Sequence, residues 1–521
     1  MTNTANTSES GPSGIGNRRI IAIRGCKGGV GASMIATNLG IFLAQIGKRV
    51  LLVDADFSNG AMHCWLGKLQ PERFITQVLH EGMTIEKAAT TTDITGLYLL
   101  AGRAGAGGTG SLSAARAETF LCQLRAVSVD YVIIDLSSDF EDFTLSIFTE
   151  ADYPILVTAP LPDAVEVTYR FMNAAWLHLL LASDEIQDEK LLAQIRGALY
   201  QQGAPVSPRE FTSTLANLDS DAGETAKELS VMFHPLLVIN QVKIKEDEEL
   251  GAAMVSAAAR WTGLNPMVLG TIGWDENVWL AMRRSRVLLI EFSRSQVCKD
   301  LEQVLRRILS LQHTDVASRV TVPPPTLRQN YYQLLEIYPG ASEEEIRRAH
   351  KQLFNWFGLE GLAVRGAATE PERELLQRRA EEAHARLLDR SVRREYDRKN
   401  FPEGFIPTEE QDAAPRDSIA GTVTATHESL PKVVLREGDV VDGAFLGNLR
   451  KERGVELADI SNRAKVSVRY LKAIEQEKFA DLPAAVFTRG FVTEFARFLK
   501  VDPRRAATDF MRKYDNWQRK R

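Results

Sequence analysis

The amino-acid sequence predicts an α/β protein: a doubly wound parallel sheet followed by two small all-α domains. Three observations support this prediction. Short apolar runs alternate with helical patterns from residue 18 to residue 312, and apolar strands between helices are typical of a parallel sheet covered on both faces. Two stretches, one rich in proline and one polar, then set off two helical segments. A chain of 521 residues also exceeds what one core can hold.

The elements of the sheet domain follow one another in a regular order. Apolar and β-branched runs predict strands, and they lie at residues 18–25, 48–56, 97–102, 130–136, 152–160 and 235–242. Apolar residues at helical spacing predict a helix over 34–47 and a closing helix over 300–311. Residues 183–232 are polar and interrupted by glycine and proline, which indicates an insertion in this domain.

Composition divides the rest of the chain. The expected segments are a disordered N-terminus at 1–17, the sheet domain at 18–312, a linker at 313–328, a helical domain at 329–400, a disordered linker at 401–440 and a basic helical domain at 441–521. The last segment holds 18 Lys and Arg against 11 Asp and Glu, a net charge of +7, which leaves about −12 on residues 1–440. A basic domain on an acidic body indicates an anionic partner for that domain.

The cysteines and the apolar runs favour a reduced, cytoplasmic setting. The four cysteines form no CxxC pair, so the sequence indicates neither a zinc site nor a disulfide framework. Residues 1–17 lack the basic-then-apolar order of a signal peptide. No apolar run approaches the roughly 20 residues of a membrane span, so no transmembrane segment is expected.

A glycine-rich loop, CKGGVGAS at residues 26–33, joins the first predicted strand to the first predicted helix. Gly28, Gly29 and Gly31 let the backbone curl so that successive N–H groups point at phosphate oxygens. The following helix turns its positive end to the same place, and Ser33 is placed to ligate Mg²⁺. A tight turn without a ligand is the alternative interpretation, but the order of strand, loop and helix favours a phosphate site.

Acidic residues stand at the ends of two predicted strands. Asp54 and Asp56 end one strand, and Asp135 lies near the end of another. The carboxyl ends of parallel strands face the ligand crevice in such sheets. One carboxylate can hold a metal ion or its water, and another can polarise an attacking water. The sequence thus predicts functional carboxylates beside the glycine-rich loop.

Residues 18–312 resemble the MinD/ParA family of ATPases, including its FlhG branch. The resemblance is carried by KGGVG, VLLVDAD, VIIDL, ADYPILVTAP, LVINQV and LGTIGWDENVWLAMRRSR, which stand in the family order. It implies a P-loop NTPase fold with a deviant Walker A motif, ATP and Mg²⁺ as cofactors, and an ATP-dependent sandwich homodimer. The residues that match the family's functional positions are Lys27 (the signature lysine that reaches the partner's nucleotide), Ser33 (the Mg²⁺ ligand), Asp56 (the water-activating carboxylate), Asp54 (its companion), Asp135 (which holds Mg²⁺ through water) and Asn240 (the adenine contact).

Two positions depart from the family pattern. Cys26 stands where glycine is frequent, and it is discounted because ParA members carry glutamine there. Ala32 stands where the family has the lysine that contacts the β- and γ-phosphates. The change removes a charge-assisted contact worth roughly 1.5–3 kcal/mol, and the loss is larger in the transition state, where charge develops on the γ-phosphoryl group. We expect a site that binds nucleotide weakly and hydrolyses it slowly or not at all. A fold kept as a structural relic is the alternative.

The segment 329–400 resembles a J domain, through YYQLLEIYPGASEEEIRRAHKQLFNWFGLEG and RLLDRSVRREYDR. J domains stimulate a chaperone ATPase through a His-Pro-Asp tripeptide, and the corresponding positions here are Gly358, Leu359 and Glu360. A chaperone partner is therefore not expected. Two interpretations stay open: a helical hairpin used for docking, or a spacer without a partner.

Residues 441–521 contain a helix-turn-helix pattern, with ELADISNRA and SVRYLKAIEQ on either side of a short turn. The start of the second helix of such a motif enters the major groove. The domain also resembles the N-terminal helix-turn-helix domain of RodZ, through RYLKAIE, LPAAVFTRGFV and FARFLKVDP, which implies docking on a cytoskeletal protein. Three alternatives stay open for this domain: it binds DNA, it binds a protein partner, or it binds neither. The candidate DNA- or partner-binding residues are Arg463, Lys465, Ser467, Arg469, Tyr470 and Lys472.

These features predict a cytoplasmic, nucleoid- or pole-associated ATP-binding regulator. It would dimerise on ATP and position or regulate a cellular structure in polarity, motility, division or segregation. Two alternatives stay open. One is a nucleotide-independent DNA-binding transcription regulator that dimerises through a degenerate ATPase fold. The other is a cytoskeletal adaptor resembling RodZ.

Overall fold

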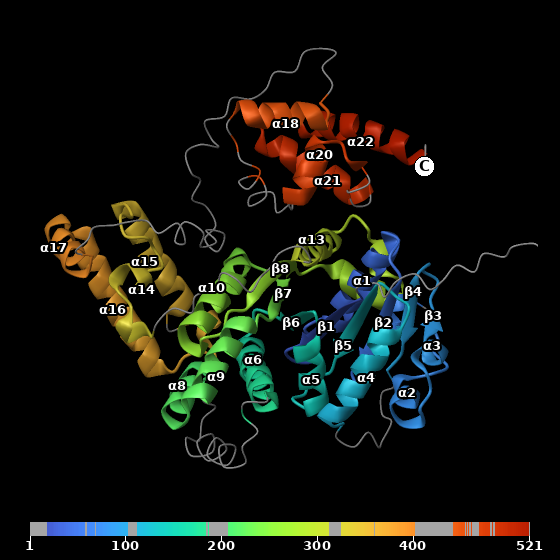
Figure 1. Cartoon of the computed structure of the whole chain (residues 1–521), viewed down its shortest axis with the longest axis horizontal. Coiled ribbons are helices and arrows are strands. Elements are labelled where there is room, and N and C mark those ends of the chain that lie inside the picture. The colour runs from blue at the N-terminus through green and yellow to red at the C-terminus, as the bar shows by residue number, and fades with distance from the viewer. Residues whose placement is uncertain are drawn as a thin grey trace, which may run out of the picture. The chain divides into compact units, whose positions relative to one another are not determined.

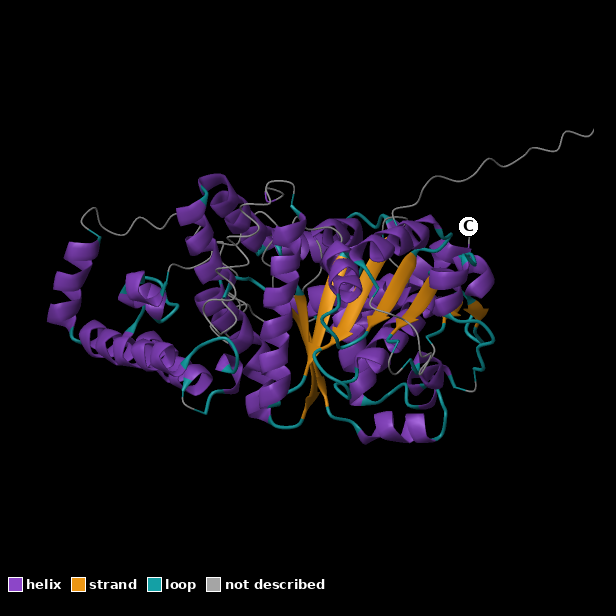
Figure 2. Ribbon diagram, turned by 90° about the horizontal axis from the view of Figure 1, so that it is seen from below, coloured by secondary structure: helices purple, strands orange, loops and turns teal. Residues whose placement is uncertain are grey.

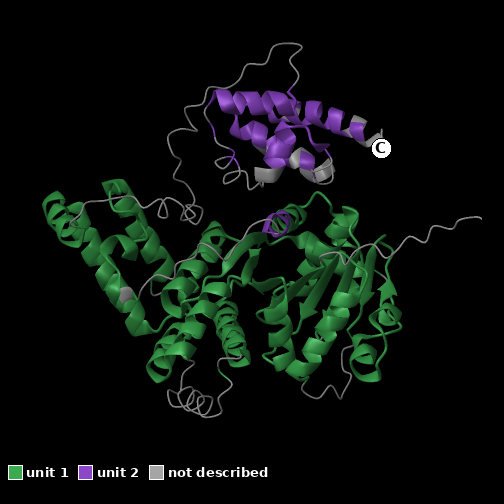
Figure 3. Ribbon diagram, in the orientation of Figure 1, with its two compact units in different colours: residues 1–305, 317–414 green, residues 306–316, 415–521 purple. Residues whose placement is uncertain are grey.

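The structure is a computed structural model. It describes residues 18–401 and 441–519, apart from 58–59, 68, 103–111, 184–185, 187–206, 312–324, 359, 454, 456, 458–459, 461–467, 480–481 and 483–484. The chain forms two compact units, residues 1–305 with 317–414 and residues 306–316 with 415–521 (Figure 3). The predicted N-terminal segment, most of the first linker and nearly all of the second linker lie outside the described residues.

The first unit is built on an eight-stranded sheet with the order β3-β4-β2-β5-β1-β6-β7-β8 (Figure 1). All neighbouring strands are parallel except β3 and β4. The winding direction reverses at β1, and in sheets of this kind ligands bind beyond the carboxyl ends of the strands beside that point. The strands are β1 Arg19–Gly25, β2 Val50–Ala55, β3 Thr90–Thr91, β4 Leu97–Leu100, β5 Tyr131–Leu136, β6 Tyr153–Thr158, β7 Leu236–Val242 and β8 Met267–Gly273.

The doubly wound fold is confirmed, and six of the strands fall within the six predicted ranges. β8 was missed. Its sequence MVLGTIG is interrupted by glycine and partly exposed at the edge of the sheet, so it lacks the continuous apolar run of a central strand.

Helices cover both faces of the sheet, as Figure 2 shows. One face carries a core to which α4, α5, α6 and α10 all contribute. Helix α1 covers the other face, where Gly40 lies close against Leu52. The helices and short turns of this part are α1 Ala32–Gln45, η1 Met62–Leu66, α2 Ile75–Glu81, α3 Ile85–Ala88, α4 Ala114–Ala126, α5 Asp142–Glu150, α6 Pro162–Ala182, α8 Pro208–Leu218, α9 Ser220–Met232, η3 Lys245–Glu249, α10 Leu250–Ala257, η4 Ala258–Thr262, α11 Glu276–Arg283, α12 Leu288–Glu291 and α13 Gln296–Leu311.

The predicted insertion ends in two capped helices. Ser207 begins α8 and accepts a hydrogen bond from the Glu210 amide, with Pro208 in the first turn. The Asp219 side chain caps α9 by accepting from the Ala222 amide. Both helices contact α6 or η4, so the described part of this segment extends the core of the sheet domain.

The J-like segment is docked on the sheet domain. Its elements are η6 Thr326–Arg328, α14 Tyr331–Leu334, α15 Glu343–Phe357, η7 Leu362–Val364, α16 Glu370–Leu388 and α17 Arg390–Asn400. Ser342 caps α15 as the sequence predicts, accepting from the Glu345 amide at 3.2 Å. Apolar side chains of α14, α15 and α16 belong to the same core as those of α6 and α10. These helices and the sheet domain therefore bury one continuous hydrophobic core.

The second unit is a small helical domain with its own core, built from α18 Gly443–Glu452, α20 Val468–Glu475, α21 Ala485–Phe498 and α22 Pro503–Arg519. A nearly buried ion pair ties α18 to α20, because Arg450 Nε lies 2.6 Å from Glu475 Oε1. At least one basic residue of this segment is therefore paired with an acidic residue inside the unit.

Candidate functional site

The glycine-rich loop connects β1 to α1 at the carboxyl edge of the sheet. Gly29 and Gly31 have φ angles of +84° and +92°, in the left-handed region that favours glycine. A Cβ on Gly31 would lie 2.4 Å from the Asn240 Nδ2 atom. Only glycine therefore fits at this point, and the loop has the curled backbone that the sequence predicts for a phosphate cradle.

Two polar side chains at the end of β7 hold the loop from across the sheet. Asn240 Nδ2 donates to the Val30 carbonyl at 2.7 Å, and Gln241 Nε2 donates to the Gly29 carbonyl at 2.7 Å. Asn240 thus lies against the phosphate loop, and an adenine-contacting role for it stays a prediction. Gln241 was not among the predicted residues, and its one signal in the sequence was its position next to Asn240 at a strand end.

Ser33 and Asp135 are brought together as predicted metal ligands. Ser33 is half-buried in the first turn of α1, where free backbone N–H groups and the helix dipole favour an anion. Its hydroxyl lies close enough to the Asp135 carboxyl group to favour the ionised form of that group, against the larger effect of burial. A hydroxyl and a carboxylate are the hard oxygen ligands that suit Mg²⁺ beside a nucleotide, so this pair fits the predicted ion.

The two strand-end carboxyl groups face each other across neighbouring strands. Asp54 of β2 is the register partner of Asp135 of β5, and the two residues are 0% and 2% exposed. Burial raises the pKa of Asp54 to about 6 and raises the pKa of Asp135 well above its ordinary value. A cation between them would relieve this cost. Asp56 follows β2, and its amide donates to Asp54 Oδ1 at 3.4 Å.

Lys27 is paired within the chain. Its Nζ lies 2.5 Å from Oδ2 of Asp163 in the first turn of α6, and the Lys27 hydrogen bond lowers the pKa of Asp163. The Asp163 side chain is 65% exposed, so water can compete for this pair. Asp163 was missed in the sequence, where its one signal was an acidic residue at a predicted strand–helix junction.

Large apolar side chains are exposed along the same edge of the sheet. Each follows a different strand: Phe140 after β5, Leu161 after β6, Ile244 after β7 and Trp274 after β8, with exposed fractions of 39%, 43%, 55% and 53%. We call these four residues the apolar row. Several exposed apolar groups along one edge are typical of a surface that another molecule covers.

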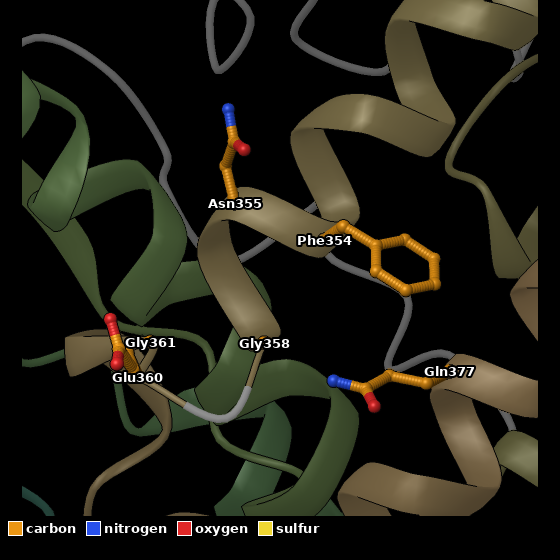
Figure 4. A pocket seen from close by; sticks show the side chains of 6 residues that line it. All are labelled: Phe354, Asn355, Gly358, Glu360, Gly361 and Gln377. Atoms are coloured by element: carbon orange, nitrogen blue, oxygen red, sulfur yellow. The ribbon is translucent and has the colours of Figure 1, made fainter.

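The J-like segment uses the end of its hairpin for contacts inside the chain. Trp356 Nε1 donates to Glu249 Oε2 at 3.0 Å, and the Phe357 ring packs edge-on against Trp261 with centroids 5.2 Å apart. Leu359, the middle residue of the tripeptide position, lies outside the described residues. A shallow cavity of about 560 Å³ opens there (Figure 4), lined by Phe354, Asn355, Gly358, Glu360, Gly361 and Gln377.

The candidate residues of the helix-turn-helix are described in part. Arg463, Lys465 and Ser467 lie outside the described residues, as does the side chain of Arg469. Tyr470 stacks on Phe491 at 5.3 Å and packs against the core of this unit. Lys472 is exposed on α20, whose neighbouring Leu471 is buried. Lys472 is thus free to meet a partner, and Tyr470 is partly committed to the fold.

Two absences concern the described residues alone. Among them no three His, Cys, Asp or Glu side chains converge on a metal position. In the same part of the chain, no helix is long and apolar enough to cross a membrane.

Two regions of the chain match families of known proteins. Residues 18–174 match a family described as an AAA domain, and residues 445–506 match a family described as a helix-turn-helix domain. The chain is 29% identical over 199 residues to the septum site-determining protein MinD of Synechocystis sp., covering 38% of this chain and 73% of that protein. It is 24% identical over 291 residues to the antiactivator FleN of Pseudomonas aeruginosa, covering 56% and 86%.

A third relative is the sporulation initiation inhibitor protein Soj of Bacillus subtilis. The identity is 33% over 194 residues, covering 36% of this chain and 77% of that protein. The likeness agrees with the loop, the strand-end carboxyl groups and the parallel sheet described above. Through its sheet domain, the chain belongs to the MinD/ParA family of P-loop ATPases.

Proposed function

We propose that the chain is a MinD/ParA-type regulator that binds Mg-ATP, dimerises on it and positions or regulates a cellular structure. The observation that supports the proposal is the neighbourhood of Ser33 and the buried Asp135, which we call the magnesium pair, beside a loop whose Gly29 and Gly31 have positive φ angles. A decayed site would not need a buried, partly desolvated carboxyl pair, because buried carboxylates without a cation cost stability. The names of two relatives, septum site-determining protein and antiactivator, support a regulatory output.

Ala32 sets the expected strength of the site. The lysine that it replaces supplies a charge-assisted contact of roughly 1.5–3 kcal/mol. The backbone N–H groups of the loop, the positive end of α1 and the magnesium pair remain. We propose that these retain weak ATP binding, and that hydrolysis, which depends most on charge at the γ-phosphoryl group, is slow or absent. Asp56 would then activate the attacking water without a lysine at position 32 to stabilise the charge on the γ-phosphoryl group.

Dimerisation would bury the carboxyl edge of the sheet. The apolar row flanks the phosphate loop on strands β5 to β8, and a second copy of the chain would remove it from water. Lys27 would have to leave Asp163 to reach a partner's nucleotide, and an exposed ion pair costs little to break. Two linked helix-turn-helix units in a dimer would bind a repeated target with higher avidity than one.

The target of the helix-turn-helix unit is DNA or a cytoskeletal or polar protein. Exposed Lys472 favours an anionic target. The second candidate function, a DNA-binding regulator that works without nucleotide, is favoured by Ala32 alone. We propose no chaperone partner, because Trp356 and Phe357 use the hairpin end for contacts with the sheet domain.

The test is binding and turnover of Mg-ATP by the full chain beside two variants. We expect wild type to bind Mg-ATP with little turnover. Ala32→Lys should tighten binding by about tenfold or more and raise turnover, because it restores the missing charge. Asp56→Ala should bind as wild type does and abolish any residual turnover. No binding by wild type at millimolar Mg-ATP would refute the proposal and favour the nucleotide-independent regulator.

A further inference from the structure

Arg24 is a fully buried charge on the strand that leads into the phosphate loop. It is 0% exposed on β1, where the neighbouring side chains are apolar. Its guanidinium carbon lies 3.7 Å from the centre of the Phe171 ring of α6 and 5.0 Å from that of Phe140. Burial lowers the pKa of Arg24 to about 10, so the side chain remains a cation at neutral pH.

The guanidinium group holds the segment that follows Asp135. Arg24 Nη2 donates to the Ser138 carbonyl at 2.6 Å and to the Asp139 carbonyl at 3.0 Å. The segment is also bonded internally, since the Glu141 amide donates to Asp139 Oδ1 at 3.0 Å. Arg24 thus ties this segment, residues 137–141, to β1.

Arg24 acts from the face of the sheet opposite the magnesium pair. Side chains alternate between faces along a strand, and Ile134 and Leu136 belong to the core beneath α4, α5 and α6. Asp135 between them therefore points to the other face, with Ser33. Arg24 shares the α6 face through Phe171. It cannot touch the metal site and works through the backbone of residues 137–141.

The two accepted bonds fix the direction of two amide groups. In a trans peptide the C=O and the N–H point in opposite directions. Because the carbonyls of Ser138 and Asp139 point inward to Arg24, the amides of Asp139 and Phe140 point away from it. No described residue accepts a hydrogen bond from either amide. Two adjacent, outward-pointing N–H groups make a ready donor pair for an anionic oxygen.

The arrangement costs stability that a purely structural role does not explain. Arg24 Nε and Nη1 are buried without an acceptor in the described part of the chain, and a buried cation with unused donors is unfavourable. An apolar side chain of similar volume would fill this place at lower cost. Residues that cost the fold in this way are concentrated at functional sites.

We propose that Arg24 is a positioning residue that aims the amides of Asp139 and Phe140 at the terminal phosphate of ATP. This inference rests on the proposed nucleotide function. In a P-loop site the metal ion bridges the β- and γ-phosphates. Asp135 would hold that ion, so the segment that directly follows Asp135 lies near the terminal phosphate. ADP lacks that phosphate. Arg24 therefore contributes to the preference for ATP over ADP and leaves the common part of the two nucleotides untouched.

The test compares Mg-AMPPNP and Mg-ADP binding to the full chain with Arg24, with Arg24→Met and with Arg24→Lys. We expect Arg24→Met to lower the AMPPNP-to-ADP affinity ratio by about tenfold, the value of a lost charged hydrogen-bond set. ADP affinity and the melting temperature should not fall, because an apolar replacement of a buried charge is often neutral or stabilising. Arg24→Lys should recover part of the ratio, since one ammonium can reach a carbonyl.

Three results would overturn the inference. An unchanged affinity ratio in Arg24→Met, or an equal loss for both nucleotides together with a lower melting temperature, would leave Arg24 with a structural role only. Wild-type protein that binds neither nucleotide would instead refute the proposed function on which the inference rests. Hydrogen exchange over residues 137–145 separates these cases, because a loosened segment in Arg24→Met exchanges faster whether or not nucleotide binds.

Discussion

At the scale of single residues, the chemistry depends on two carboxyl groups that the fold keeps from water. Burial raises the pKa of Asp54 to about 6 from an ordinary 3.8, so the native state holds a proton that the unfolded chain has released between these values. Stability falls as pH rises wherever the native state binds more protons. Burial raises the pKa of Asp135 as well, which adds a loss of stability of the same sign as pH rises.

The first prediction follows from that sign. The free energy of unfolding of the metal-free protein should decrease as the pH rises from about 4 to above 6, and Asp54→Asn should flatten part of that decrease. Urea unfolding at several pH values measures both slopes. Added Mg-ATP should reduce this decrease in the free energy of unfolding, because its binding favours the ionised forms of Asp54 and Asp135. An identical pH slope in wild type and Asp54→Asn would contradict the assignment.

The residue scale also shows what a sequence can and cannot reveal. Ser33, Asp54 and Asp135 were predicted to meet because the carboxyl ends of neighbouring parallel strands share one edge. The pairing of Lys27 with Asp163 was not predicted, and neither was the bonding of Arg24 to the carbonyls of residues 138 and 139. Lys27 and Asp163 are 136 positions apart, and Arg24 and Ser138 are 114 apart. No local pattern marks such a pair, since a single acidic or basic residue is normally solvated.

At the scale of elements, the junction between the phosphate loop and α6 is joined by a weak bond. The Lys27–Asp163 pair is exposed, and exposed ion pairs contribute little to stability. We expect Asp163→Asn to leave the melting temperature unchanged and to lower the ATP concentration needed for dimerisation, because Lys27 is released. Light scattering during an ATP titration measures this. The control is Glu150→Gln, which breaks another exposed ion pair, with Arg125. An equal shift of the ATP concentration needed for dimerisation in both variants would show that the Lys27–Asp163 pair does not restrain the dimer.

The docking of α15 on the sheet domain is a second property of elements. The sequence predicted α15 and its cap, because Ser342 and Glu345 have local signals. It could not predict the surface on which the helix packs, since an amphipathic pattern identifies a buried face and not its partner. Trp356 and Phe357 instead contact residues of η3 and η4, far away in the chain.

Shared packing predicts shared unfolding. Phe357→Ala should lower the free energy of unfolding by about 3–5 kcal/mol, and the sheet domain and the J-like helices should lose structure in one transition. Phe354→Ala is the control, because this ring on the same helix is only half-buried beside His350, and its loss should cost clearly less. Denaturant unfolding followed by tryptophan fluorescence reports on Trp261 and Trp356. Two separate transitions, with Phe357→Ala moving only one, would show an independent module.

At the scale of the whole molecule, the proposed function depends on an ATP-controlled dimer through the carboxyl edge of the sheet. The apolar row follows the ends of β5, β6, β7 and β8 on that edge, with β1 and the phosphate loop between β5 and β6. The helix-turn-helix unit has a separate core, so dimerisation of the first unit would pair two such units through their linkers. Leu161→Asp should prevent the dimer by placing a charge in the row. Met232→Asp is the matched control, since Met232 is 68% exposed at the end of α9, just before β7.

The most direct test is sedimentation velocity of the full chain without nucleotide, with Mg-ADP and with Mg-ATP. The account predicts a monomer in the first two conditions and a dimer with Mg-ATP, which Leu161→Asp abolishes and Met232→Asp retains. A chain that stays monomeric at millimolar Mg-ATP, or that dimerises equally in all three conditions, would contradict nucleotide control.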